Sequence, residues 1–107
     1  MAATNINTGA TANSTPSPVR FPLGHLFMTQ GAIEALEEAN QSAQDFLSRH
    51  ARLEQGELSD EDQRENEFSV DKYLRILSAF RTAKGEKIWV ITEADRSATT
   101  LLLPSEY

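Results

Sequence analysis

Residues 87–104, KIWVITEADRSATTLLLP, decide the fold class of this chain. Two runs rich in β-branched and apolar side chains, residues 87–94 and 99–103, predict two strands. The polar residues 95–97 between them predict a tight turn, and Pro104 ends the second strand because proline has no N–H to donate. The stretch therefore predicts an antiparallel hairpin.

The same alternation extends upstream into YLRILSAFR, residues 73–81. Leu74, Ile76, Ser78 and Phe80 would share one face of a further strand. The intervening loop, TAKGE, predicts a hairpin connection in which Gly85 supplies a positive φ. Three successive strands with short loops predict an antiparallel meander.

Three hydroxyl side chains, each before a helix-forming segment, predict the starts of helices upstream of the meander. The predicted helices cover residues 30–39, about 43–53, and a segment from residue 60, with caps at Thr29, Ser42 and Ser59. The third segment has no apolar residue between Leu58 and Phe68, so we expect an exposed helix or a structured loop. Residues 25–28, HLFM, predict a short edge strand.

These elements predict an α+β fold. Two to three short N-terminal helices pack on a C-terminal three-stranded antiparallel β-meander, with residues 25–28 as a candidate additional strand. Residues 1–20 are polar and rich in Thr, Asn, Ser and Ala, and they cannot bury enough apolar surface to offset the entropy of ordering. We therefore predict a disordered tail over residues 1–20 and a single small domain over residues 21–107.

The composition excludes several classes of function. The chain has no cysteine, so it forms no disulfide and has no thiolate nucleophile. Its formal net charge of −6 disfavours binding to a phosphate backbone. It has neither a secretion signal nor an apolar run that predicts a membrane span, so we expect a cytoplasmic protein. No motif predicts a cofactor or a metal site, and the two histidines, His25 and His50, lack further ligands. We expect His50 to be a structural side chain.

The strongest compositional signal is a run of eight acidic residues between Glu54 and Asp71, opposed only by Arg64. A solvated face that keeps the protein soluble is one interpretation. The other is an acidic surface that meets a basic protein partner. The candidate partner-binding residues are Glu57, Asp60, Glu61, Asp62 and Glu65.

The turn at residues 95–97 also has two interpretations. In the simpler one, Asp95 caps the loop amides, and Arg96 is solvated or pairs with Glu93. In the other, a polar contact surface forms at one end of the sheet, made of Glu93, Asp95, Arg96, Thr99 and Thr100.

The second face of the meander carries Trp89 and Ile91, which two short helices cannot cover together with the first face. Either another segment of the chain buries these side chains or they form an apolar interface. A free strand edge at Leu101–Leu103 would also allow two copies to pair as a homodimer.

Two stretches resemble a group of small, uncharacterised plasmid-related proteins carried on bacterial plasmids and integrative conjugative elements. They are FPLGHLFMTQGAIEALEEANQSAQDFLSRHARLEQGELSDEDQREN and RILSAFRTAKGEKIWVITEADRSATTLLLPSEY, of which KIWVITEADRS is the most specific part. The chain departs from the group at Gln55, where an aromatic residue is expected. The resemblance implies a mobile genetic element and a bacterial cytoplasm, and it implies no activity.

Two functions follow as hypotheses. One is a non-enzymatic accessory protein that binds a DNA-handling or host-defence protein through its acidic surface. The other is a small RelE-like ribonuclease toxin or a related nucleic-acid-acting protein, with Arg75, Arg81, Arg96 and Tyr107 as candidate residues on the sheet. Basic side chains gathered on one concave face would favour the toxin, and basic side chains paired with carboxylates would favour the binding protein.

Overall fold

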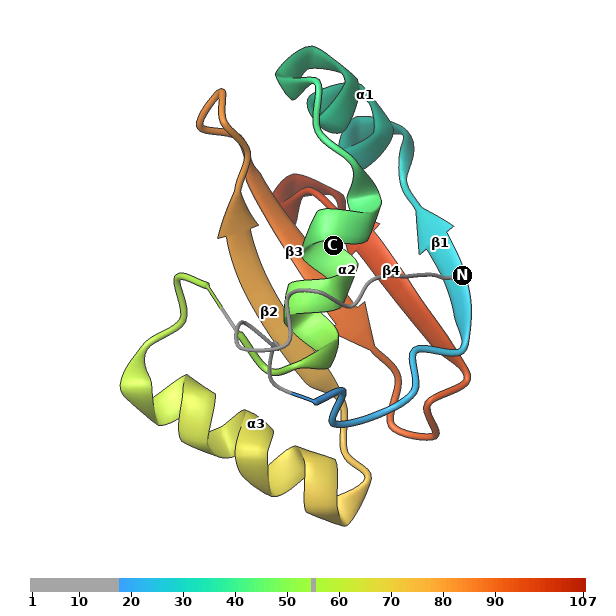
Figure 1. The fold of residues 1–107 in the computed structure, drawn as a ribbon, viewed down its shortest axis with the longest axis vertical. Helices are drawn as coiled ribbons and strands as arrows, with labels where there is room; N and C mark the ends of the chain where they lie inside the picture. The colour runs from blue at the N-terminus through green and yellow to red at the C-terminus, as the bar shows by residue number, and fades with distance from the viewer. Residues whose placement is uncertain (1–17, 55) are drawn as a thin grey trace, which may run out of the picture.

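The computed structural model describes residues 18–54 and 56–107. Figure 1 shows helices and strands in the α+β arrangement that the sequence predicts. In chain order the elements are β1 (His25–Met28), α1 (Gln30–Ala39), α2 (Ala43–Ala51), α3 (Asp60–Lys72), β2 (Ile76–Arg81), β3 (Lys87–Thr92), β4 (Ala98–Leu102) and the 3-10 helix η2 (Pro104–Glu106).

The strands form one mixed sheet in the order β1-β4-β3-β2. The predicted meander is confirmed, because β2 pairs antiparallel with β3 and β3 with β4. The additional strand is also confirmed, and β1 runs parallel to β4. Because β4 pairs on both sides, the prediction of a free edge at residues 101–103 is wrong: within the described chain, the free edge belongs to β1.

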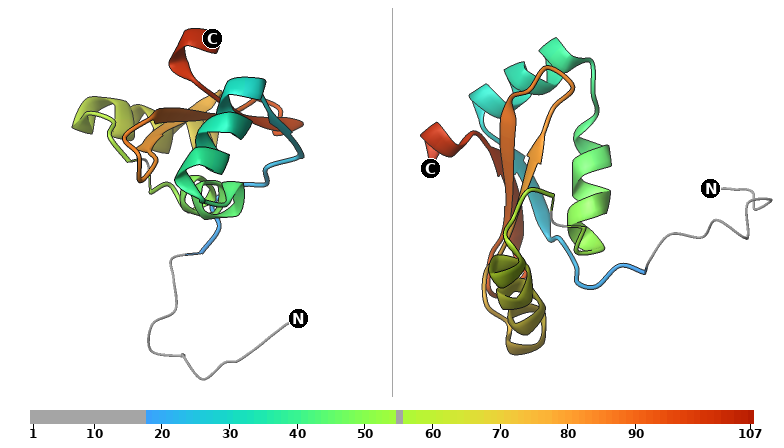
Figure 2. Two further views of the ribbon diagram at one scale, coloured as in Figure 1. Left: turned by 90° about the horizontal axis from the view of Figure 1, so that it is seen from above. Right: turned by 90° about the vertical axis from the view of Figure 1, so that its left-hand side faces the viewer.

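The helices do not share one face of the sheet. Figure 2 shows α2 lying across one face, with α1 near one end of the sheet and α3 beside the opposite end. The expectation that all helices pack on one face therefore holds for α2 and in part for α1, whose Ala32, Ala35 and Leu36 belong to the core on that face, but not for α3. The charged sequence of α3, in which only Asn66 and Ser69 are buried, explains why this helix lies at the margin.

The predicted helix starts are confirmed by their caps. Thr29 accepts a hydrogen bond from the N–H of Ala32 at 3.2 Å, and Ser42 accepts one from Gln44 at 3.1 Å. Helix α2 ends at Ala51, earlier than predicted, because Leu53 takes a left-handed φ of 62° that a helix cannot continue.

Residues 1–17 of the predicted tail lie outside the described residues, and so does Gln55. At the end of that tail, the N–H of Arg20 donates to the Ala51 carbonyl at 2.8 Å, and its guanidinium pairs with Glu67 at 2.9 Å. Phe21 is buried with Leu53 and Ile76 in a small apolar cluster. Arg20 and Phe21 therefore already contact the folded domain.

The main core lies between the sheet and the helices α1 and α2. Its largest fully buried side chains are Phe46 from α2 and Phe80, Ile88, Val90 and Leu101 from the strands. The strand face that carries Ile76, Ser78 and Phe80, which the alternation in the sequence predicted to share one side, is the face that α2 covers. A polar group is buried beside this core, where Ser78, Thr92 and Thr99 point to the same side and have no exposed surface.

His50 connects these three hydroxyl groups. Its Nδ1 lies 2.6 Å from the Ser78 hydroxyl, and its Nε2 lies 2.8 Å from the Thr92 hydroxyl. The Thr92 and Thr99 hydroxyl oxygens are 2.7 Å apart, and the Thr99 hydroxyl donates to the Leu23 carbonyl at 2.7 Å. This buried hydrogen-bond chain joins α2, three strands and the segment before β1.

Only one assignment of donors and acceptors is consistent along this buried hydrogen-bond chain. The Leu23 carbonyl can only accept, so Thr99 donates to it and must accept from Thr92. Thr92 has then used its proton, so the Nε2–H of His50 donates to Thr92. The Nδ1 of a neutral His50 therefore accepts from Ser78. Burial lowers the pKa of His50 to about 3 and keeps the ring neutral.

Replacing Thr99 by Val should destabilise the protein by about 1–3 kcal/mol, because the Thr92 hydroxyl and the Leu23 carbonyl both lose a buried partner. Thr100→Val is the matched control. Thr100 is the next residue, half-buried on the opposite face of the sheet. Urea unfolding compares the two variants, and equal free energies of unfolding would contradict the role assigned to the chain.

Candidate protein-binding surface

Helix α3 carries most of the candidate acidic surface and begins at a strong cap. The Ser59 hydroxyl accepts a hydrogen bond from the Asp62 N–H at 3.1 Å. Asp60, Glu61 and Asp62 fill the first turn, where negative charge interacts favourably with the helix dipole. The sequence explains both features, because a hydroxyl cap followed by acids is typical of a helix start.

Asn66 attaches the middle of α3 to the edge of β2. Its side-chain amide donates to the Leu77 carbonyl at 2.6 Å, and its carbonyl oxygen accepts from the Leu77 N–H at 3.3 Å. The side chain thus pairs with β2 as a neighbouring strand would. Two residues along, Glu57 donates its N–H to the Ala79 carbonyl at 2.7 Å. This edge of the sheet is therefore covered.

Arg96 fixes the C-terminal end of α3, and the expectation of a solvated Arg96 or a pair with the Glu93 carboxylate is wrong. The side chain is 6 % exposed and stacks on the Tyr73 ring, with the guanidinium carbon 5.0 Å from the ring centroid. Its two terminal nitrogens donate to five backbone carbonyls, those of Ser69, Val70, Leu74, Glu93 and Ala94. Arg96 thereby ties the end of α3 to the β3–β4 turn.

The five residues of the predicted sheet-end cluster are not brought together. Arg96 is directed at α3, and Thr99 belongs to the buried hydrogen-bond chain. Thr100 projects from the opposite face of the sheet, while Glu93 and Asp95 are exposed. Asp95 caps the turn as the simpler interpretation predicts, and hydrogen bonds from Ser97 lower its pKa. The turn therefore anchors α3.

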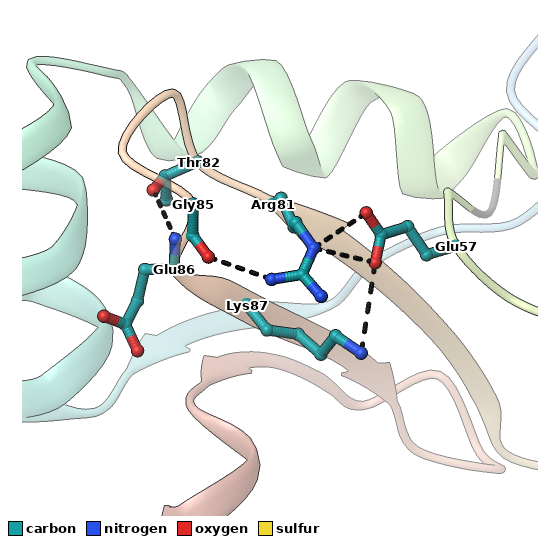
Figure 3. A network of polar contacts seen from close by, with 6 residues as sticks. All are labelled: Glu57, Arg81, Thr82, Gly85, Glu86 and Lys87. Carbon is teal, nitrogen blue, oxygen red and sulfur yellow. Dashed lines mark hydrogen bonds and ion pairs between the residues drawn. The ribbon is translucent and has the colours of Figure 1, made fainter.

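The predicted acidic residues divide into two groups. Glu57 forms ion pairs with Arg81 at 3.0 Å and Lys87 at 3.9 Å, which Figure 3 shows at the β2–β3 hairpin. Its charge is thus neutralised within the chain. The other four residues are exposed on α3 and have no ion pair within the described residues; they are Asp60, Glu61, Asp62 and Glu65.

Exposed apolar side chains adjoin these acids, and no pattern in the sequence marks them as a binding surface. Phe68 follows Glu61 and Glu65 on one stripe of α3 and is 57 % exposed. Tyr73 and Leu74 follow the end of the helix and are also exposed. We call the exposed acidic and apolar side chains of α3 and of the two residues after it the α3 outer face; they are Asp60, Glu61, Asp62, Glu65, Phe68, Tyr73 and Leu74.

The second candidate interface is only partly open. Ile91 is buried, and Trp89 is half-buried under the C-terminal residue Tyr107, whose ring centroid lies 5.6 Å away. The Tyr107 hydroxyl accepts a hydrogen bond from Arg75 at 2.6 Å. The chain itself therefore covers part of this apolar face.

The basic residues assigned to a ribonuclease toxin have other contacts. Arg81 pairs with Glu57, Arg96 is buried against carbonyl groups, and Arg75 bonds to Tyr107. The close pair of His50 and Ser78 has no exposed surface, so a substrate cannot reach it. Within the described residues, no three His, Cys, Asp or Glu side chains are placed to hold a metal ion, and no helix is long and apolar enough to cross a membrane.

Comparisons with protein families, with curated proteins and with solved structures find no match to this chain. The resemblance to plasmid-related proteins therefore remains a prediction from the sequence.

Replacing Arg96 by Lys keeps the charge but leaves a single donor group in place of the guanidinium fork. We expect a loss of about 2 kcal/mol or more in unfolding free energy, because several buried carbonyls lose their donor. Amides at the end of α3, such as Leu74 N–H, should exchange faster with solvent. Arg75→Lys, on an exposed arginine, is the matched control. Wild-type stability and exchange in Arg96→Lys would show that Arg96 does not anchor α3.

Proposed function

We propose that this protein is a non-enzymatic protein-binding accessory protein of a bacterial mobile genetic element, and that it docks on a basic partner through the α3 outer face. The observation that supports this most is the excess of acids on α3: four exposed carboxylates without an ion pair in the described residues stand against Arg64 and Lys72 around the exposed Phe68, on a helix held at its start, middle and end.

The rigidity of α3 favours binding. Ser59 caps the helix, Asn66 attaches it to β2, and Arg96 fixes its last turn. A helix that is already ordered loses little conformational entropy when a partner binds. The acidic side chains of the α3 outer face would then increase the rate of association and contribute to specificity.

The chemistry of the α3 outer face fits a partner with Lys or Arg around an apolar pocket. Carboxylates on the rim attract such a surface at a distance, and Phe68 would enter the pocket as an anchor. A DNA-handling or host-defence protein in the cytoplasm would present basic groups of this kind. The same acids repel a nucleic acid directly.

The ribonuclease hypothesis has weaker support. Its basic candidates are engaged with Glu57, with backbone carbonyls or with Tyr107, and the net charge of −6 opposes RNA binding. A direct assay of RNA cleavage by the purified protein tests it, and cleavage abolished by Arg81→Ala would favour the toxin.

Neutralising the first turn of α3 should weaken partner capture. The variant Asp60→Asn, Glu61→Gln, Asp62→Asn keeps the Ser59 cap, and we expect about tenfold weaker binding at low salt. The matched control is Glu34→Gln, Glu37→Gln, Glu38→Gln, which removes the same number of exposed charges from α1. Each variant is tested for capture of protein from lysate of the bacterial host, and the retained partner is then titrated against each one.

Circular dichroism first confirms that both variants fold. Loss of binding in the α3 variant alone supports the proposal, and the loss should diminish as salt rises. Equal binding by wild type and the α3 variant would remove the acidic residues from the interface. Equal loss in both variants would mean that net charge alone is recognised.

A further inference from the structure

The outer edge of β1 carries unpaired backbone groups. His25 and Thr29 donate their N–H groups to the Ser97 and Leu101 carbonyls, at 2.9 and 3.0 Å. Since successive residues of a strand direct their backbone groups to opposite sides, the N–H and C=O of Leu26 and Met28 point away from β4. Within the described residues, no other strand pairs with this edge.

The two edges of the sheet differ in how they are protected. Asn66 and Glu57 cover the β2 edge through hydrogen bonds to Leu77 and Ala79. Figure 1 shows β1 at the opposite margin, where none of the described helices runs along it. Natural edge strands usually carry Lys, Pro or another block against pairing. Residues 25–28 contain neither Lys nor Pro, and all four are exposed.

We propose that β1 pairs antiparallel with β1 of a second copy of this chain, about a twofold axis through Phe27. In this register, the outward N–H of Leu26 donates to the Met28 carbonyl of the second copy, and the Leu26 carbonyl accepts from the Met28 N–H of that copy. The reverse pair follows by symmetry. Phe27 then faces its own counterpart in a non-hydrogen-bonded pair, where side chains lie closest. The two sheets join into one.

Side chains on both faces support this register. Parallel pairing with β4 places Leu26 and Met28 on the face that α2 covers and Phe27 on the other face. They are 52 %, 42 % and 55 % exposed, respectively. Leu26 would pack against Met28 of the second copy, so the contact buries apolar surface on both sides of the joined sheet.

Charge distribution favours a second copy as the occupant. Each copy carries a net charge of −6, so two copies repel each other over most orientations. Residues 25–30 include no acid, and the acids beside them are Glu106, whose carboxylate bonds to Thr29, and Glu37, which lines a hollow with Met28. The larger group of acids on α3 lies at the far margin of the sheet, beside β2. Pairing through β1 therefore keeps the two acidic helices as far apart as the sheet allows. The contact is short, so we expect a reversible, concentration-dependent dimer.

Dimerisation would give the proposed function a second binding helix. The joined sheet carries one α3 outer face at each end, so a partner with two basic sites would be held by both. This consequence rests on the proposed function. The pairing itself does not, because β1 and α3 lie at opposite margins of the sheet.

The test is sedimentation equilibrium of the whole chain over a range of concentrations, with charge substitutions at the twofold axis. The wild type should approach twice the 11.9 kDa of one chain as concentration rises. Phe27→Lys alone and Phe27→Glu alone should each remain monomeric, because like charges then face each other. An equimolar mixture of the two variants should dimerise again, because opposite charges then meet.

Phe68→Lys and Phe68→Glu are the matched controls, since Phe68 on α3 is exposed to a similar extent. They should dimerise as the wild type does. A wild type that stays monomeric at every concentration would overturn the proposal and leave the edge to a strand of another protein. Dimers of either Phe27 variant alone, or a mixture that stays monomeric, would overturn the register and with it the proposal.

Discussion

The buried hydrogen-bond chain from Ser78 through His50, Thr92 and Thr99 to the Leu23 carbonyl is the constraint on which the rest of the structure depends. The donors and acceptors of all its members can be satisfied in only one arrangement of protons. A buried polar group that lacked its hydrogen bond at this site would destabilise the fold. A shift of one residue in either hairpin would turn a hydroxyl to the other face and break the chain. The chain thus fixes strand register and the position of α2 together.

Arg96 fixes the position of α3 relative to the sheet. It sits at a left-handed φ of 62°, a conformation that glycine adopts more readily. Its buried guanidinium holds carbonyls from the end of α3 and from the turn beside it. The position of α3 is therefore set by a turn that the buried hydrogen-bond chain keeps in register. These contacts hold the acids and Phe68 of the α3 outer face in fixed positions.

Local signals predicted much of this structure. Alternation between residues 73 and 103 predicted the meander, and Thr29, Ser42 and Ser59 predicted the helix starts, because both depend on neighbours in the sequence. The direction of β1 and the position of α3 depend on contacts between distant residues, such as Asn66 with Leu77. Arg96 was misjudged for the same reason: in a polar turn it resembles a solvated residue, and only the folded chain brings the α3 carbonyls to it.

The most direct test of this account is the tautomer of His50, measured by long-range ¹H–¹⁵N NMR correlation during a pH titration, with the exposed His25 as an internal reference signal. The buried hydrogen-bond chain requires a neutral His50 ring with its proton on Nε2 at pH 7. Because the folded pKa lies near 3, below the usual 6.5, the contribution of His50 to stability should be fully present above pH 6.5 and be lost as pH drops toward 3. A proton on Nδ1, or a protonation midpoint near 6.5 in the folded protein, would contradict it.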